Sequence, residues 1–203
     1  MTTLEQVLVW AAVIHLLAIA AFHLQLQLGM RRIVALEDLP DAGESLPSLS
    51  IVVAARNEER AIEQALLSLL ALDYPLLEVI VVNDRSTDAT GSILDRISTD
   101  YPQLQVLHLE MLPEKWLGKN HAMQQGAMIA SGEYILFTDA DVVFQPDSLQ
   151  RAVAHAKREQ LGMLAALPSI TMPSLLLESF ILMFASAFVI FFRPWKAPDP
   201  NSK

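Results

Sequence analysis

The 203-residue chain contains no cysteine, and its basic side chains are outnumbered by acidic ones. Without cysteine, the protein has no disulfide framework, no thiolate metal site and no cysteine nucleophile. Lys and Arg number 14 against 23 Asp and Glu, which gives a formal net charge of −9. Proteins that bind nucleic acid use Lys and Arg to neutralise phosphates, so this balance argues against nucleic acid as a partner.

Charged residues are also missing from a long stretch near the N-terminus. Val7 to Leu28 contains no Asp, Glu, Lys or Arg, and about 20 apolar residues suffice for a helix to cross a bilayer. We therefore predict a transmembrane anchor within residues 1–36, although a buried core helix is an alternative. Arg31 and Arg32 follow the run, and the positive-inside rule then places the next domain in the cytoplasm.

Two further segments flank the central part of the chain. Residues 37–48 carry four acidic and no basic side chains and are predicted to form an acidic linker. Residues 168–203 are predicted to form an apolar helix over Ser174–Phe192, with Ser174 as its N-cap, followed by a basic tail. This helix is of borderline length for a span, and we favour a position in the membrane interface over a crossing.

Apolar runs alternate with helical patterns across residues 49–167, which we predict to form one α/β domain with a mostly parallel sheet sandwiched by helices. Right-handed crossovers bring the carboxyl ends of such strands to one edge of the sheet, where ligands bind. Strands are expected at Ser50–Ala55, Glu78–Val82, Gln105–Leu109, Tyr134–Phe137 and Gly162–Leu167. Helices are expected at Glu58–Leu72 with Asn57 as its cap, from Ser86 or Thr87 to Ile97, at Asn120–Ala130 and from Pro146 to about Gln160.

Asp139 and Asp141 follow the strand expected at Tyr134–Phe137. In extended backbone, residues at i and i+2 project to the same side, so the two carboxylates are expected to lie together. Such a pair suits Mg²⁺ or Mn²⁺, which keep open positions for substrate phosphates. The alternative is a solvated turn that happens to carry two acidic residues.

Three other polar residues near the strand ends are candidates with a competing structural explanation. Asp84 ends an apolar strand and can accept a hydrogen bond from a base, or it can serve as a loop or capping carboxylate. Glu58 can bind a ribose or base, or it can simply favour a helix N-terminus. Lys119 can contact phosphate or base, or it can be an ordinary surface lysine.

Two glycine-rich phosphate-binding motifs are absent from the sequence. No GxGxxG follows the first predicted strand, and GxxxxGK[ST] occurs nowhere. These absences argue against a dinucleotide-dependent oxidoreductase and a P-loop NTPase.

Four motifs, in this order and spacing, resemble those of family 2 glycosyltransferases. The resemblance implies an inverting enzyme with the Rossmann-like GT-A fold that uses a nucleotide-diphosphate sugar. Membrane-anchored members of the ceramide-type and hopanoid-associated branch are the most similar, because of the Trp116-Leu-Gly-Lys loop and the apolar region after Asp141. The motifs are Ile51–Glu58, Val81–Asp88, Gly118–Gly126 and Phe137–Asp141.

The resemblance also implies roles for the residues at matching positions. The donor is expected to be a UDP-sugar and, because apolar segments flank the domain, the acceptor a lipid. Arg56, Asn57 and Glu58 would line the nucleotide site, Asp84 would hold the base, Lys119 would bind the nucleotide or diphosphate, Asp139 would hold ribose and metal, and Asp141 the metal.

One part of the family pattern is missing. In the family, a carboxylate well after the Asp-x-Asp motif acts as general base, and membrane members often add a Gln-x-x-Arg-Trp motif. Neither follows Asp141. We therefore expect the chain to hold the donor half of an incomplete GT-A domain without the base, as a truncated gene product or a fragment of a longer protein.

Three alternatives to an active glycosyltransferase remain open at this point. The missing base favours a non-catalytic nucleotide-sugar-binding module. Paired carboxylates on a divalent metal also occur in nucleotidyltransferases, although no Gly-rich basic loop follows the first predicted strand. A membrane scaffold would use neither the nucleotide nor the metal.

Overall fold

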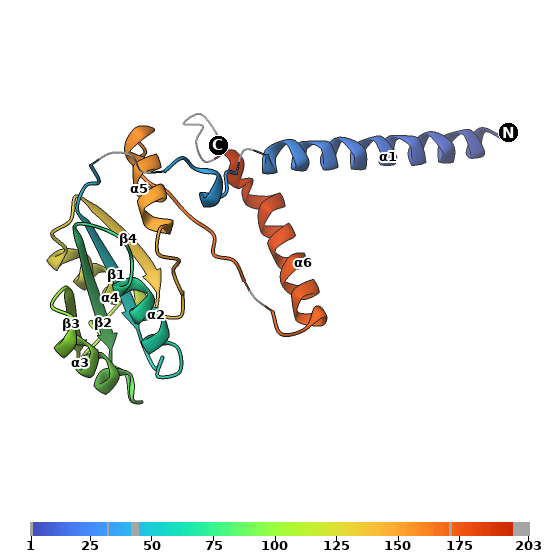
Figure 1. The fold of residues 1–203 in the computed structure, drawn as a ribbon. Helices are drawn as coiled ribbons and strands as arrows, with labels where there is room; N and C mark the ends of the chain where they lie inside the picture. Colours follow the sequence, from blue (N-terminus) through green and yellow to red (C-terminus); the bar gives the residue numbers. More distant parts are fainter. Residues whose placement is uncertain (1, 32, 42–44, 171, 197–203) are drawn as a thin grey trace. The chain divides into compact units, whose positions relative to one another are not determined.

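The computed structural model describes residues 2–31, 33–41, 45–170 and 172–196. Contacts divide the chain into two units, one formed by residues 36–168 and the other by residues 1–35 together with 169–203. Figure 1 shows the elements along the chain. They are α1 (Thr3–Met30), η1 (Leu36–Asp38), β1 (Leu49–Ala55), α2 (Ile62–Leu70), β2 (Leu77–Asp84), α3 (Thr90–Asp100), β3 (Leu104–Leu109), α4 (Gly118–Ile129), β4 (Tyr134–Asp139), α5 (Ser148–Arg158), α6 (Leu175–Phe192) and η2 (Pro194–Lys196).

The unit of residues 36–168 is built on a four-stranded sheet in the order β3-β2-β1-β4. Every neighbouring pair is parallel, which confirms the predicted α/β fold. Ala55 pairs with Asn83, and Ala54 pairs with Asp139. The register therefore brings the carboxyl ends of β1, β2 and β4 to one edge.

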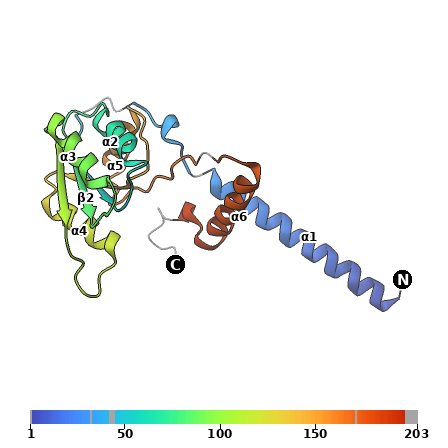
Figure 2. The same ribbon diagram turned by 90° about the horizontal axis from the view of Figure 1, so that it is seen from below.

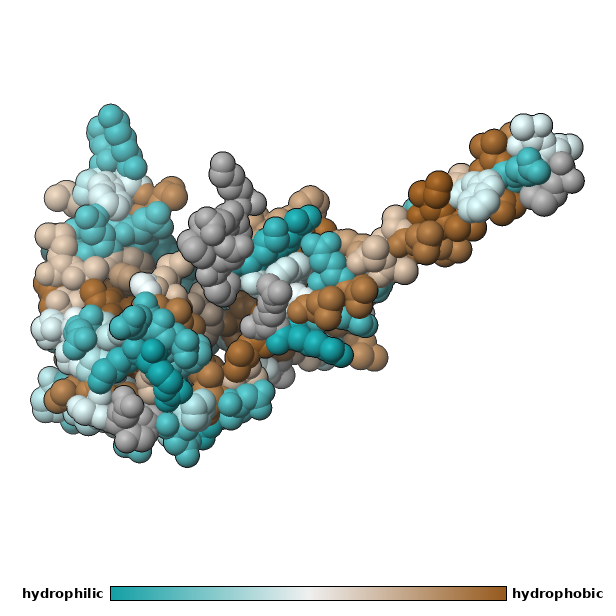
Figure 3. Space-filling model, turned by 90° about the horizontal axis from the view of Figure 1, so that it is seen from above, coloured by the Kyte–Doolittle hydropathy of each residue, from teal (hydrophilic) through white to brown (hydrophobic). Residues whose placement is uncertain are grey.

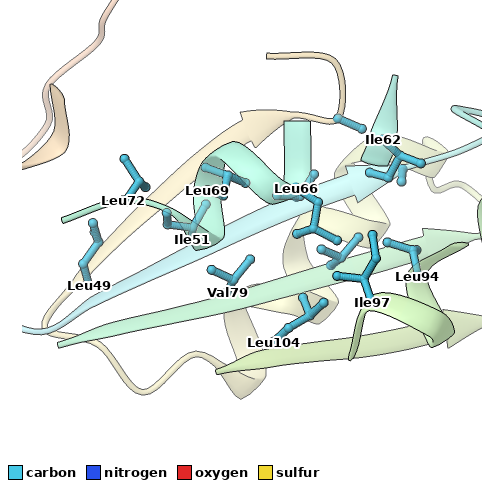
Figure 4. Packing of buried hydrophobic residues seen from close by; sticks show 14 of the residues in the cluster. Leu49, Ile51, Ile62, Leu66, Leu69, Leu72, Val79, Leu94, Ile97 and Leu104 are labelled. Atoms are coloured by element: carbon cyan, nitrogen blue, oxygen red, sulfur yellow. The ribbon is translucent and has the colours of Figure 1, made fainter. Parts of the chain in front are cut away.

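Helices cover both faces of the sheet, as Figure 2 shows with α2, α3 and α5 on one side and α4 on the other. Alternate residues of each strand point to opposite faces, so Ile51 and Val79 face the side of α2 and α3, where both are fully buried. Figure 4 shows the helical side chains that pack over them, and burial of this apolar area is the main force that holds the layers together. The labelled helical residues are Ile62, Leu66, Leu69, Leu94 and Ile97.

Helix α4 packs closely on the opposite face at Gly126, which has no side chain. Val52 and Val82 face this helix and are fully buried. A Cβ at Gly126 would overlap Val52 Cγ1 and come within 3.2 Å of Val82 Cγ2. The glycine therefore sets how near the sheet the helix, and with it the first turn at Gly118, can lie.

The strand expected at Gly162–Leu167 is wrong. These residues form neither strand nor helix, and Met163 and Leu167 are 86% and 76% exposed. An apolar run looks like a buried strand in sequence, but here no neighbouring strand pairs with it.

The expected start of two helices in the domain also differs from the structure. Asn57 does not cap the first helix, which begins at Ile62 with Ala61 as its N-cap. Neither Ser86 nor Thr87 caps the next helix, whose N-cap is Ala89. In both loops the polar side chains bond across to the other loop, so they are not free to cap their own helix.

Part of the predicted acidic linker packs on the domain. Arg151 of α5 donates hydrogen bonds to the carbonyl oxygens of Glu37 and Leu39, at 3.0 and 3.1 Å, and pairs with Asp41. Residues 42–44 of the linker lie outside the described residues.

Two helices, α1 and α6, are long and apolar enough to cross a membrane by length and composition. Figure 3 shows apolar residues along α1. Ser174 caps α6 as predicted, with its hydroxyl accepting from the Leu177 amide at 3.3 Å. Neither window is buried within the structure, which does not fit a core helix of a folded domain.

The close approach at Gly126 leads to a stability prediction. Gly126→Leu should lower the free energy of unfolding, because overpacking costs about 1–3 kcal/mol and outweighs the gain of removing glycine from a helix, about 1 kcal/mol. Urea unfolding followed by circular dichroism measures the change. Gln124→Leu, at an exposed position of the same helix, is the matched control. Equal stability of the two variants would contradict the packing argument.

Candidate functional site

A pocket of about 310 Å³ lies at the carboxyl edge of the sheet. Its walls come from the ends of β1, β2 and β4 and from the first turn of α4. The pocket is open enough for a ligand to enter, and it gathers side chains of both charges. The lining residues are Ala54, Ala55, Arg56, Glu58, Asp84, Gly118, Lys119, Asp139, Ala140 and Asp141.

The loops after β1 and β2 hold each other in place through hydrogen bonds. The Asn57 side-chain oxygen accepts from the Thr87 amide at 2.8 Å, and the Ser86 hydroxyl accepts from the Asn57 amide at 3.0 Å. The Thr90 hydroxyl accepts from the Glu58 amide at 2.8 Å. Asn57 adopts a left-handed backbone with a φ of 56°, which asparagine tolerates better than most residues. These bonds fix Arg56 and Glu58 at the pocket wall.

Asp84 is buried at the end of β2 and is held by its neighbour in the chain. Arg85 donates from Nε to Oδ1 at 2.8 Å and from Nη2 to Oδ2 at 3.1 Å. The left-handed φ of Arg85, 55°, turns its backbone at this point. These hydrogen bonds lower the pKa of Asp84 more than burial raises it, and the electrostatic influence of Arg85, Arg56 and His121 lowers it further. Asp84 is therefore an anion over the whole neutral range.

Gly118 allows the first turn of α4 to meet Asp84. A Cβ at this position would lie 2.5 Å from Asp84 Oδ2 and 3.2 Å from Arg85 Nη2. No side chain caps this helix end, and its first turn holds no acidic residue. The free amides and the helix dipole thus add positive potential to the pocket wall.

Lys119 and Asp139 form an ion pair across the pocket. Both side chains remain more than half exposed, at 59% and 55%, so either can turn to a ligand at small cost. Asp141 lines the same pocket from the turn after β4.

The pocket supplies two carboxylates suited to a divalent cation, Asp139 and Asp141. Among the residues that the structure describes, no group of three or more His, Asp or Glu side chains could hold a metal ion. A pair of carboxylates fits Mg²⁺ or Mn²⁺, which commonly take one or two protein oxygens and complete their shell with water and substrate phosphates.

The structure brings six of the seven predicted site residues to this pocket, and their roles stay predictions. Asn57 does not line it and instead supports the loop. Sequence reasoning missed Arg85 and Gly118. The Arg85 contact depends on a left-handed turn that no pattern signals, whereas a glycine just before Lys119 was a visible sign of close backbone approach.

Comparison with known proteins gives a consistent result. A family model described as Glycosyl transferase family 2 matches residues 50–191. Beta-monoglucosyldiacylglycerol synthase from Nostoc sp. is 38% identical over 120 residues, which cover 58% of this chain and 25% of that protein. 4,4'-Diaponeurosporenoate glycosyltransferase from Staphylococcus aureus is 36% identical over 123 residues, which cover 60% of this chain and 32% of that protein. The chain thus matches only about a quarter to a third of these relatives.

A solved structure shares the fold. The mannosyltransferase from Pyrobaculum calidifontis, in complex with GDP-Man and Mn²⁺, aligns with a TM-score of 0.57 and 28% identity. The alignment covers 72% of this chain and 43% of the mannosyltransferase.

The bidentate contact of Arg85 leads to a prediction about ionisation. Arg85→Gln should raise the pKa of Asp84, because the variant loses the charged hydrogen bonds while burial still opposes the anion. Carbon-detected NMR titration of labelled aspartate side chains measures the shift. Arg96→Gln, which removes an exposed arginine paired with Glu63, should leave Asp84 unchanged. An Asp84 titration that is the same in both variants would refute the assignment.

Proposed function

Because the chain belongs to glycosyl transferase family 2, we propose that it binds a nucleotide-diphosphate sugar and forms the donor-binding part of an enzyme that transfers the sugar to a lipid. The observation that carries the proposal is the meeting of Arg56 and Lys119 with three aspartates in one pocket. Since the chain matches only part of its relatives, the transfer reaction is proposed for the whole protein.

The positive groups of the pocket would bind the diphosphate. Lys119 would leave its pair with Asp139 and contact a phosphate oxygen. The planar guanidinium of Arg56 would donate hydrogen bonds to a second phosphate oxygen. The first turn of α4, with its free amides, favours an anion at the same wall. Together they offset the negative charge that the aspartates would otherwise present to the donor.

Asp139 and Asp141 would hold the metal, and Asp139 would also accept a hydrogen bond from the ribose of the donor. When bound, Mg²⁺ or Mn²⁺ screens the diphosphate and stabilises the departing nucleoside diphosphate. The Mn²⁺ in the related mannosyltransferase supports the use of a divalent metal in this family.

Asp84 would recognise the base. Its two oxygens accept from Arg85, and each keeps a lone pair for a further donor. A ring N–H, as in uracil, would complete the carboxylate's hydrogen bonding, and we propose UDP-sugar as the donor. Glu58, in the loop after β1, would contact the nucleotide. Asn57, in the same loop, would act only by holding this loop in place.

The proposed transfer is a direct displacement that inverts the anomeric carbon. A base takes the proton of the acceptor hydroxyl, the oxygen attacks the carbon, and the bond to the diphosphate breaks. Among the residues that the structure describes, the acidic side chains that line the pocket are Glu58, Asp84, Asp139 and Asp141. All four are assigned to the donor or to its metal, so none serves as the base in this proposal.

A lipid acceptor and a membrane location fit the rest of the chain. One relative is named for a diacylglycerol lipid, and two apolar helices flank the pocket-bearing unit. We propose that α1 anchors the protein in the membrane and that Arg31 and Arg32 keep the domain on the cytoplasmic face.

A second candidate function is donor binding without transfer. It is favoured by the same observation on the pocket, because Asp147 and Glu159, the acidic residues between Asp141 and the end of the pocket-bearing unit, do not line it. In this case the chain would be a nucleotide-sugar-binding module.

The metal proposal can be tested by binding. Asp141→Asn should weaken UDP binding at least about tenfold when Mn²⁺ is present, about 1.4 kcal/mol, and change it little when Mn²⁺ is absent. Calorimetry with the chain in lipid nanodiscs measures both affinities. Asp100→Asn removes an equal charge from an exposed site outside the pocket and should have no effect. Equal losses with and without Mn²⁺ would argue against a metal at Asp141.

The acceptor proposal can be tested by transfer. Membranes that contain the protein, given radiolabelled UDP-sugars, should place label in the lipid extract rather than on soluble acceptors. A strict preference for soluble acceptors would refute the lipid assignment. UDP binding without turnover would favour the binding module, and release of pyrophosphate would indicate a nucleotidyltransferase.

A further inference from the structure

We propose that α6 is embedded in one leaflet of the bilayer, with both of its ends on the side where the α/β unit lies. The proposal rests on the membrane anchoring by α1 given above. It replaces a second crossing by an apolar helix held in one half of the bilayer.

The surface of α6 matches the acyl region of a bilayer. None of its residues is buried within the structure, and Leu175, Leu176 and Phe191 are at least 80% exposed. Glu178, in the first turn, is its one charged residue. A helix that lies flat among headgroups needs a polar face along its length, and α6 has none. Its partner is therefore the hydrocarbon of the membrane.

Helix α6 ends at a left-handed residue. Arg193 adopts a left-handed backbone with a φ of 47°, and its amide donates to the Val189 carbonyl at 3.1 Å. The short helix η2 follows directly. This sharp stop, unusual for a residue other than glycine, leads straight into the turn that carries Trp195.

Trp195 joins this turn to the C-terminal end of α1. Its side chain is 9% exposed, and it packs over Gly29. A Cβ at Gly29 would lie 2.5 Å from Cε2 and 2.8 Å from Cε3 of the indole. Ala21, Leu24, Gln25 and Leu28 surround the contact. Figures 1 and 2 both show the C-terminal ends of α1 and α6 together and their N-terminal ends apart.

Connectivity then fixes the side on which each helix end lies. Residues 31–35 join the end of α1 directly to the α/β unit, and residues 169–174 join that unit to the start of α6. Both of these ends therefore lie on the side of the domain. If α6 crossed the bilayer, its end would lie on the opposite side, about 30 Å away, and Trp195 could not reach Gly29.

The segment between the domain and α6 cannot itself cross the bilayer. The described residues from 161 to 174 form neither helix nor strand. Irregular backbone exposed to lipid leaves polar amides without partners, so it does not cross the hydrocarbon region. Both ends of α6 are therefore on the domain side.

The charges at the shared end agree with this placement. Arg31, Arg193 and Lys196 all lie near the Gly29–Trp195 contact in sequence. Basic side chains next to an aromatic ring are typical of a headgroup layer that carries anionic lipids.

Cysteine labelling tests the proposal, since the wild-type chain has no cysteine. Single variants Ser169→Cys and Lys196→Cys flank α6, Ser92→Cys marks the exposed surface of the domain, and Thr3→Cys marks the far end of α1. A membrane-impermeant maleimide is applied to sealed vesicles of both orientations. Positions 169, 196 and 92 should react from one side, and position 3 should react from the other.

The alternative results are distinct. Reaction of position 196 from the same side as position 3, or only after detergent is added, would overturn the placement of α6 in one leaflet while leaving the anchor intact. Reaction of all four positions from one side, or release of the protein from membranes by alkaline carbonate, would overturn both the anchor and the placement of α6 in one leaflet.

Discussion

The parallel register of four strands is the constraint on which the site depends. Each crossover returns the chain to the same end of the sheet, so the residues after β1, β2 and β4 share one edge. Close packing then decides how tightly they meet. Gly126 lets α4 rest on Val52, and Gly118 lets its first turn touch Asp84. Positive groups from one helix thus face carboxylates from two strands across a small pocket.

The alternation of apolar runs was enough to predict the fold, because a parallel sheet buried on both faces needs continuous hydrophobic strands. The four observed strands include residues that were expected, with small shifts at their ends. The run at 162–167 misled because hydrophobicity alone does not reveal whether a neighbouring strand exists. Its side chains are exposed, and composition gives no sign of that.

The candidate site was predictable in its residues more than in its contacts. Arg56, Glu58, Asp84, Lys119, Asp139 and Asp141 follow predicted strands or begin a helix, and all line one pocket. Asn57 and Arg85 behave differently because each takes a left-handed backbone. That conformation sends the Asn57 side chain to the neighbouring loop and folds Arg85 back on Asp84. Such turns depend on tertiary contacts, which a single sequence does not encode in a readable pattern.

In the absence of a ligand, the ion pair between Lys119 and Asp139 neutralises the charges of these two side chains in the pocket. Lys119 pairs with the Asp139 carboxylate, which a bound cation would also contact. A cation that displaces Lys119 would leave its ammonium group free to bind an anion. Occupancy of Asp139 and occupancy of Lys119 are therefore energetically linked. Linkage is reciprocal, so if one ligand raises the affinity for the other by some factor, the second ligand raises the affinity for the first by the same factor. For the proposed metal and diphosphate, this ion pair would favour the binding of both ligands together over the binding of either one alone.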